Sequence, residues 1–304
     1  MKRSATPQPA PPPRPALGCM RIAELAPDQL HHLLTTAIEL GIQLFDHADI
    51  YANGESERRF GQAIRDLGME RTTLFLQSKC GIRNGTFDFS RDHILASVDA
   101  SLARLQTDYL DQLLLHRPDA LVEPDEVAAA FDHLARTGKV KTFGVSNMNP
   151  WQIQVLQSRL SRPLQAVQIQ MSLGHCPAID HGFNANMISE AATQRDGGIL
   201  EYSRLHGLNI QAWSPLQFGY FKGTFIDHPD YGHLNHVLRQ VAGQHGISPS
   251  AVAIAWLLRH PAGIQPILGT TRPERLRELF QATTMTMTRD TWYELYRASG
   301  KILP

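Results

Sequence analysis

The pattern that most constrains this chain is a repeated alternation of short apolar runs with longer amphipathic runs. Continuous short apolar runs are typical of parallel β-strands that helices cover on the outside. The amphipathic runs between them have the periodicity of helices that bury one face. We count eight apolar runs, each followed by at least one amphipathic run, so the sequence predicts eight consecutive β-α units.

The expected elements can be given by their residues. The eight predicted strands are Ala16–Met20, Ile42–Phe45, Leu74–Ser78, Leu110–Leu115, Val140–Val145, Ala166–Ile169, Leu208–Trp213 and Gly263–Leu268. The predicted helices are Pro27–Leu40, Glu55–Leu67, Arg91–Leu105, Pro124–Arg136, Pro150–Ser158, Ile188–His206, Leu234–His245, Pro249–His260, Pro273–Gln281 and Arg289–Ala298. An irregular stretch follows the sixth strand, and a long loop follows the seventh.

Eight such units close into an α/β structure of the TIM-barrel type, the (β/α)8 barrel. Connections between parallel strands are right-handed, and the 304 residues exceed the ~250 that such a barrel typically needs. The rival architecture is an open doubly wound sheet. It predicts a G-x-G-x-x-G turn after the first strand, and the sequence has none there. We therefore expect one barrel domain over residues 17–304.

The segment Met1–Ala16 differs from the rest of the chain. It contains six prolines and shows almost no apolar patterning, which predicts a disordered, proline-rich arm. It lacks the apolar core of a secretory signal. We expect the arm over residues 1–16 to precede the barrel domain, and we expect a cytoplasmic protein.

Composition narrows the classes of partner. Lys and Arg together number 29, as do Asp and Glu, and no basic stripe is present, so neither nucleic acid nor a membrane surface is expected as a partner. No apolar run approaches the ~20 residues of a membrane span. The three cysteines suggest a reducing compartment, and the 14 histidines lack the spacing of a zinc site, so no metal is expected. We expect a monomer that acts on a small molecule.

Four polar residues follow neighbouring strands of the predicted barrel. Asp46 and Tyr51 follow the second strand, Lys79 the third and His116 the fourth. Each residue alone is more simply explained as a turn, packing or surface residue. The active sites of such barrels lie at the carboxyl ends of the strands, so the four side chains are expected to converge at one mouth of the barrel.

These four residue types form a coherent set for proton transfer to a carbonyl oxygen. A tyrosine with a pKa of about 10 is a poorly matched donor near neutral pH, and a nearby lysine cation lowers that pKa. The aspartate keeps the lysine charged and in place, and the histidine orients the carbonyl. Two other functions stay open: a lyase that uses Lys79 as a Schiff-base nucleophile, and a non-catalytic or sensor barrel that binds a protein partner.

The ordered motifs resemble those of the aldo/keto reductase superfamily, in its bacterial predicted-oxidoreductase branch. The resemblance covers about residues 16–300 and rests on FDHADIYANGESE, LQSKCGI, LLLHRPD, FGVSN, AWSPL and PILGTTRPERLRE. It implies reversible NADPH-dependent reduction of aldehydes or ketones to alcohols. In that reaction Tyr51 would be the general acid, Lys79 and Asp46 would tune it, and His116 would orient the substrate.

The resemblance also implies an NADP(H) site across the barrel mouth. The nicotinamide carboxamide would be held by Ser146, Asn147 and Gln170, its ring would stack on Trp213, and Ser214 and Leu216 would approach the pyrophosphate. Gly18, Cys19 and Met20 would line the floor of the site. The adenosine-phosphate segment would include Gly269, Thr271, Arg272, Arg275 and Glu278.

Three positions depart from the family pattern. The usual N-terminal hairpin is replaced by the proline-rich arm. Gly269 stands where many relatives have a phosphate-binding lysine, and Leu279 where many have an asparagine that contacts adenine. The phosphate contacts must therefore come from nearby groups. Thr271, Arg272 and Arg275 lie at the start of the helix opened by Pro273, where an anion such as the 2′-phosphate of NADPH is favoured.

Two further features lie near the expected site. Arg117 directly follows His116 and could meet an anionic substrate, although pairing with a local carboxylate is the simpler expectation. The loop over residues 217–232 contains five aromatic residues. They either pack the loop onto the barrel or line a substrate pocket, because loops at this end of a barrel often contain functional residues.

Overall fold

The computed structural model describes residues 14–304 of the chain. Residues 1–13, which make up most of the predicted disordered arm, lie outside the described residues. At the end of that segment Pro15 and Ala16 are already buried, and the first strand begins at Ala16. Ala16 therefore belongs to the barrel.

The eight predicted strands form a closed barrel of parallel strands, which confirms the predicted fold class. The barrel strands are β1 (Ala16–Gly18), β2 (Leu44–Asp46), β3 (Phe75–Cys80), β6 (Leu110–Leu115), β7 (Val140–Ser146), β8 (Ala166–Gln170), β9 (Asn209–Trp213) and β10 (Gln265–Leu268). Neighbours follow chain order, and β10 pairs with β1 to close the ring.

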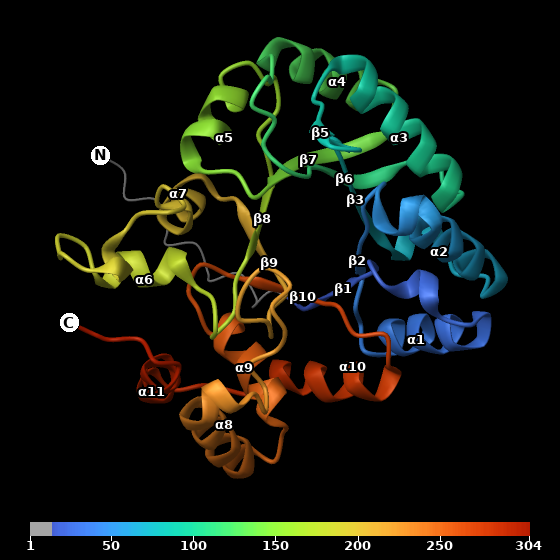
Figure 1. Cartoon of the computed structure of the whole chain (residues 1–304). Helices are drawn as coiled ribbons and strands as arrows, with labels where there is room; N and C mark the ends of the chain where they lie inside the picture. Colours follow the sequence, from blue (N-terminus) through green and yellow to red (C-terminus); the bar gives the residue numbers. More distant parts are fainter. Residues whose placement is uncertain (1–13) are drawn as a thin grey trace, which may run out of the picture.

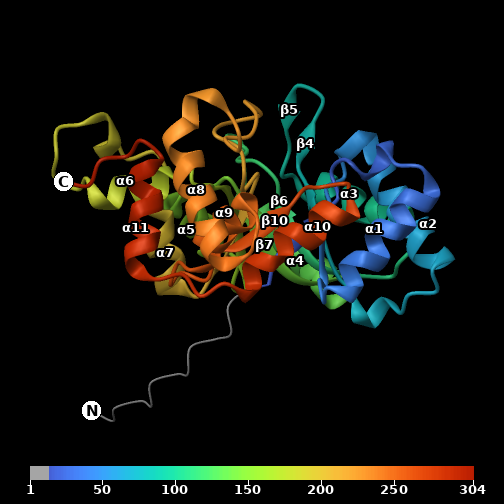
Figure 2. The ribbon, with the colours of Figure 1, turned by 90° about the horizontal axis from the view of Figure 1, so that it is seen from below.

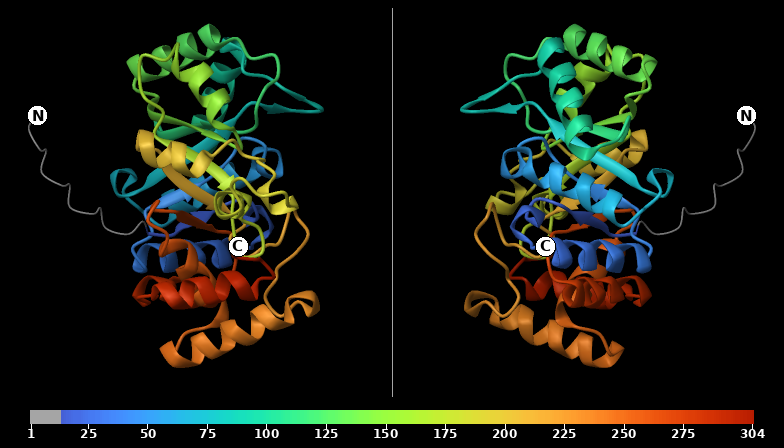
Figure 3. Two further views of the ribbon diagram at one scale, coloured as in Figure 1. Left: turned by 90° about the vertical axis from the view of Figure 1, so that its left-hand side faces the viewer. Right: turned by 90° about the vertical axis from the view of Figure 1, so that its right-hand side faces the viewer.

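Helices surround the strands on the outside (Figure 1). They are α1 (Pro27–Glu39), α2 (Glu55–Asp66), α3 (Arg91–Leu105), α4 (Pro124–Arg136), α5 (Pro150–Gln157), α6 (Pro177–Phe183), α7 (Ile199–His206), α8 (Gly232–His245), α9 (Pro249–Leu258), α10 (Pro273–Phe280) and α11 (Arg289–Ala298). Helix α8 packs on α9 and α11 and lies at the periphery of the molecule (Figure 3). None of the helices over residues 14–304 has the length and apolar character needed to cross a membrane.

Two stretches differ from the sequence prediction. The predicted helix Ile188–His206 is wrong over its first half, because Gly197 and Gly198 both have positive φ and the helix α7 begins only at Ile199. The stretch expected to be irregular contains the short helix α6, with Pro177 in its first turn.

A small hairpin was also missed. Strands β4 (Ile82–Arg83) and β5 (Thr86–Phe87) pair antiparallel across Asn84 and Gly85. Asn-Gly is the favoured pair for a tight hairpin turn, and Gly85 has the positive φ that such a turn requires. The hairpin follows the carboxyl end of β3 and projects beyond the surrounding helices (Figure 2).

Candidate active site

A cavity of about 1090 Å³ lies at the carboxyl ends of the barrel strands. At one end it is lined by Tyr51 and His116, and at the other by Arg272 and Arg275. The wall between them includes Trp213. This extended shape places the predicted catalytic residues and the predicted adenosine-phosphate segment in one continuous space.

The ammonium of Lys79 is the centre of the polar contacts at the Tyr51 end. Its Nζ atom lies 2.7 Å from both carboxylate oxygens of Asp46, 2.9 Å from the backbone oxygen of His47 and 3.2 Å from the hydroxyl of Tyr51. Lys79 is almost fully buried, so water does not compete for these contacts. The structure thus brings three of the four predicted catalytic side chains into direct contact.

The charge of Lys79 is stabilised where it lies. Burial alone would lower the pKa of Lys79, but the Asp46 carboxylate and the Tyr51 hydroxyl outweigh burial and raise that pKa above its ordinary value. Lys79 is therefore an ammonium group at neutral pH. An uncharged amine, which a Schiff base requires, is disfavoured at this position.

The hydroxyl of Tyr51 is also buried against this ion pair. Burial raises the pKa of Tyr51 above 10, Lys79 opposes that shift, and Asp46 reinforces it. Lys79 lowers the pKa of Tyr51, as the sequence analysis expected, but the opposite effect of burial is larger. Tyr51 stays protonated through neutral pH and can donate a proton.

His116 lies beside Tyr51 with its ring edge-on, and the two ring centroids are 6.0 Å apart. Burial, followed by the charges of Lys79 and Arg117, lowers the pKa of His116 well below its ordinary value. The imidazole is therefore neutral. Its Nδ1 atom is buried with no partner among residues 14–304, so the ring is restrained by packing and by its backbone contact to Cys80.

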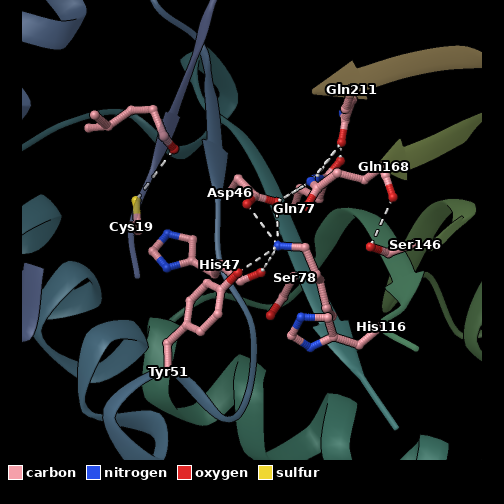
Figure 4. A network of polar contacts seen from close by, with 12 residues as sticks. Cys19, Asp46, His47, Tyr51, Gln77, Ser78, His116, Ser146, Gln168 and Gln211 are labelled. Carbon is pink, nitrogen blue, oxygen red and sulfur yellow. Dashed lines mark hydrogen bonds and ion pairs between the residues drawn. The ribbon is translucent and has the colours of Figure 1, made fainter. Parts of the chain in front are cut away.

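A cluster of three buried glutamines lies beside Asp46 (Figure 4). Gln77 and Gln168 each donate from Nε2 to Oδ1 of Asp46, at 2.5 and 3.0 Å, and each also donates to Oε1 of Gln211, at 2.9 and 3.0 Å. Gln211 returns a hydrogen bond of 2.9 Å to Gln77. All three are buried, so Asp46 is surrounded by donors on several sides.

Amide and hydroxyl groups meet at the ends of β7 and β9. Asn147 donates to the hydroxyl of Ser146 at 2.8 Å and accepts from the indole Nε1 of Trp213 at 3.0 Å. Asn147 and Ser214 both have positive φ, an uncommon conformation for residues other than glycine. Such backbone conformations concentrate at functional sites, and here they direct polar groups into the cavity.

The far end of the cavity is rich in arginine. Arg275 is paired with Glu278 at 2.5 Å and contacts the hydroxyl of Ser250. Arg272 is exposed and forms no ion pair with the described residues 14–304. Arg21 donates to the backbone oxygen of Gly269, so a guanidinium lies beside the position where many relatives have a lysine.

Most of the predicted site residues line the cavity, but not all of them do. The lining includes Gly18, Met20, Asp46, Tyr51, His116, Ser146, Asn147, Trp213, Ser214, Leu216, Gly269, Thr271, Arg272 and Arg275. Cys19 is fully buried in the core instead, Lys79 lies just behind the wall, and Glu278 reaches the site only through Arg275.

One predicted site residue, Gln170, is not among the residues that line the cavity. Gln168, not Gln170, lines the cavity. Side chains alternate along a strand, so Gln168 and Gln170 face the same side of β8. The sequence does not show which of the two lies at the depth of the cavity. The sequence analysis also missed Arg21, which lies far from Gly269 in the chain.

Comparison with known proteins agrees with this geometry. The model of the aldo/keto reductase family matches residues 16–299. The chain therefore belongs to the aldo/keto reductase family and is an oxidoreductase, which confirms the resemblance seen in the sequence.

Individual relatives cover nearly the whole chain. A 6-dehydroglucose reductase from Agrobacterium fabrum is 37% identical over 92% of this chain and 91% of its own. Oxidoreductase YdhF from Escherichia coli is 36% identical over 89% and 87%. An aldo-keto reductase from Klebsiella pneumoniae, solved in complex with NADPH, has a TM-score of 0.76 at 26% identity, over 96% of this chain and 93% of its own.

Proposed function

We propose that this protein reduces aldehydes or ketones to alcohols with NADPH, reversibly, and that Tyr51 donates the proton. The observation that supports this most directly is the position of Lys79, in contact with both Asp46 and Tyr51, two residues that line the cavity.

The cavity residues fit the proposed cofactor. The arginines Arg21, Arg272 and Arg275 suit the phosphates, and Trp213 offers an aromatic surface for the nicotinamide ring. Ser146, Asn147 and Gln168 offer hydroxyl and amide groups for the carboxamide. When bound there, NADPH supplies the hydride.

The protein's own residues account for the proton. Tyr51 is protonated at neutral pH, since its ordinary pKa of about 10 is raised further by burial, and it lies beside the neutral His116. An N–H of His116 can donate to the substrate carbonyl oxygen and orient it toward the Tyr51 hydroxyl. As Tyr51 gives up its proton, the ammonium of Lys79 at 3.2 Å stabilises the tyrosinate that forms. Asp46 keeps that ammonium in place.

The Schiff-base alternative has little support from this geometry. Both oxygens of Asp46 contact the ammonium of Lys79, and the raised pKa keeps the nitrogen protonated. A non-catalytic or sensor barrel that binds NADP(H) and a protein partner predicts no steady-state turnover with any carbonyl compound. A panel of carbonyl compounds, followed by loss of nicotinamide absorbance, distinguishes the enzyme from that alternative. The panel should include 6-dehydroglucose, because one relative is named for it.

The variant Tyr51→Phe tests the mechanism. It removes the hydroxyl and keeps the ring, so the fold and NADPH binding should survive. General acid catalysis typically contributes about 10²- to 10⁴-fold, and single-turnover reduction with saturating NADPH should slow by at least that order. Lys79→Met should be comparably damaging, because it removes the charge that stabilises the tyrosinate.

The control is Tyr109→Phe, which changes a tyrosine that contacts Arg71 and Lys141 away from the cavity. Its single-turnover rate should match that of the wild type. Equal rates in Tyr51→Phe and wild type would sink the proposed role of Tyr51, even if NADPH binds.

A further inference from the structure

At the Tyr51 end of the cavity, the guanidinium of Arg117 forms no ion pair with the described residues 14–304, and we propose that it selects the substrate. The guanidinium of Arg117 binds a carboxylate on the carbonyl compound, so the preferred substrates are oxo acids with an apolar body. This inference rests on the proposed reductase function and names its substrate class.

Arg117 directly follows His116 and lines the cavity. Its guanidinium carbon lies 5.7 Å from the ring centroid of Trp213 and 5.4 Å from that of Tyr220. Both distances are within the range of cation–π contacts. Such contacts hold the guanidinium in place but do not occupy its hydrogen-bond donors, whereas a carboxylate partner would. Arginine has five N–H donors in a fixed plane, and these remain available to a ligand in the cavity.

The expected local carboxylate partner is absent from the described residues 14–304, so the simpler sequence-based expectation was wrong. The nearest acidic residue in the chain is Asp119. Its Oδ2 accepts from the backbone N–H of Phe89 at 2.9 Å, and its Oδ1 accepts from that of Leu121 at 2.8 Å. Among residues 14–304 no carboxylate forms an ion pair with Arg117.

The other charges at this end of the cavity cancel. Lys79 and Asp46 form an ion pair, and the lowered pKa of His116 leaves that ring neutral. Arg117 is thus the uncompensated charge beside the predicted position of the substrate carbonyl. One guanidinium matches one carboxylate in charge and in fork geometry. A phosphate ester, with close to two negative charges, would leave one charge uncompensated.

The walls around Arg117 define the rest of the ligand. Ile50, Tyr220 and Phe221 line the cavity and have exposed fractions of 38%, 62% and 57%. Trp213 lies 6.2 Å from Tyr220 and 6.5 Å from Phe221, measured between ring centroids, so the aromatic rings form one surface. Exposed apolar surface of this kind suits an apolar ligand body. A straight-chain or aromatic oxo acid satisfies both the charge and these walls.

The test compares matched substrates on the NADPH-bound enzyme. A series of straight-chain aldehydes with a terminal carboxylate is paired with the methyl esters, which have the same skeleton without the charge. In the wild type, kcat/KM for the best acid should exceed that for its ester by about tenfold or more, as expected for a charge-assisted hydrogen bond. Arg117→Gln should bring the ratio close to one, mainly through KM of the acid, and Arg117→Lys should restore part of it.

Two further measurements keep the test independent of folding and turnover. Titration of the hydroxy-acid product into the NADP⁺-bound enzyme should give measurable affinity in the wild type and at least tenfold weaker affinity in Arg117→Gln. The control variant Arg83→Gln removes a guanidinium that is paired with Asp88 on the β4–β5 hairpin, outside the cavity lining, and should leave the acid-to-ester ratio unchanged.

The outcomes separate this inference from the proposed function. If acids and esters are reduced equally well, or if neutral sugar aldehydes or phosphorylated aldehydes are clearly preferred, the role of Arg117 is wrong while the reductase function stands. If no carbonyl compound is reduced with NADPH, the proposed function itself fails. A ratio that persists in Arg117→Gln would also overturn the inference.

Discussion

The carboxylate of Asp46 is in contact with more donors than one ion pair needs. Its Oδ1 accepts from Lys79, Gln77 and Gln168, all of them buried. Each amide N–H compensates part of the negative charge of Asp46. Asp46 raises the pKa of Tyr51, and Lys79 lowers it. Because the amide donors weaken the effect of Asp46, the lowering of the Tyr51 pKa by Lys79 is less opposed.

This arrangement predicts a pH effect for Gln77→Leu. Alcohol oxidation with NADP⁺ requires a deprotonated Tyr51, so its rate rises with pH toward the pKa of that tyrosine. Without the Gln77 donor the negative charge of Asp46 is less compensated, and the pKa of Tyr51 rises further. The oxidation profile should move to higher pH by up to roughly one unit, since a hydrogen bond to a charged group contributes about 1.5–3 kcal/mol.

The matched control is Gln265→Leu, which removes an amide that contacts Gln211 and Asn209 but not Asp46. Its profile of log kcat/KM against pH should coincide with that of the wild type. A Gln77→Leu enzyme that loses thermal stability but keeps the wild-type profile would show that the glutamine only fills space.

Single residues also show where sequence reasoning stops. Asp46, Tyr51, Lys79 and His116 could be predicted because strand ends converge in any barrel. The glutamines could not, because an isolated Gln in a strand gives no sign that it points inward and meets two others. The sequence indicated the effect of Lys79 on the pKa of Tyr51 but not the larger effect of burial, because burial cannot be read from neighbours in the chain.

At the level of elements, regular patterns were predictable and local exceptions were not. The barrel strands were located from apolar runs, and the caps of several helices follow ordinary chemistry, as at Asn149, whose side chain accepts from the backbone of Gln152 at 3.0 Å. Helix α7 starts late because two glycines interrupt the pattern. The hairpin β4–β5 is too short to produce a periodic signal.

Helices α9 and α11 are joined to each other by a tryptophan pair. The rings of Trp256 on α9 and Trp292 on α11 stack with centroids 4.7 Å apart, and each indole N–H donates to the backbone oxygen of the other residue at 3.1 Å. Trp256 is fully buried. The pair therefore combines apolar burial with two satisfied polar groups between two helices.

Trp256→Ala should lower the free energy of unfolding by about 3–5 kcal/mol, because it leaves a large cavity and removes the hydrogen bond that the Trp256 indole donates. Thermal denaturation of the variant measures this loss. Trp151→Ala is the comparison, since that side chain is 69% exposed and its removal should change the free energy of unfolding by no more than about 0.5 kcal/mol. Similar melting temperatures for the two variants would mean that α9 and α11 do not depend on this pair.

The molecule as a whole is electrically neutral, yet its long cavity is not. The chain has 29 basic and 29 acidic residues, whereas the cavity lining includes Arg21, Arg117, Arg272 and Arg275 against Glu24 and Asp46. The arginines lie toward opposite ends: Arg117 is beside His116, and the other three are near Gly269 and α10. The geometry thus suits a ligand pair with negative charge at both ends, a phosphorylated cofactor and an anionic substrate.

Within that arrangement Arg272 and Arg275 differ in their availability for the 2′-phosphate of NADPH. Arg275 is paired with Glu278, whereas Arg272 forms no ion pair within residues 14–304. Arg272→Ala should therefore weaken NADPH binding by about tenfold or more, as expected for one charge-assisted hydrogen bond, and leave NADH binding nearly unchanged. Arg272→Ala with Arg275→Ala should abolish most of the preference for NADPH.

Titration of both dinucleotides into each variant measures the ratio, and Arg277→Ala is the control because that arginine pairs with Glu39 outside the cavity lining. Equal affinity of the wild type for NADPH and NADH would show that these arginines do not bind the 2′-phosphate, whatever the oxidoreductase reduces.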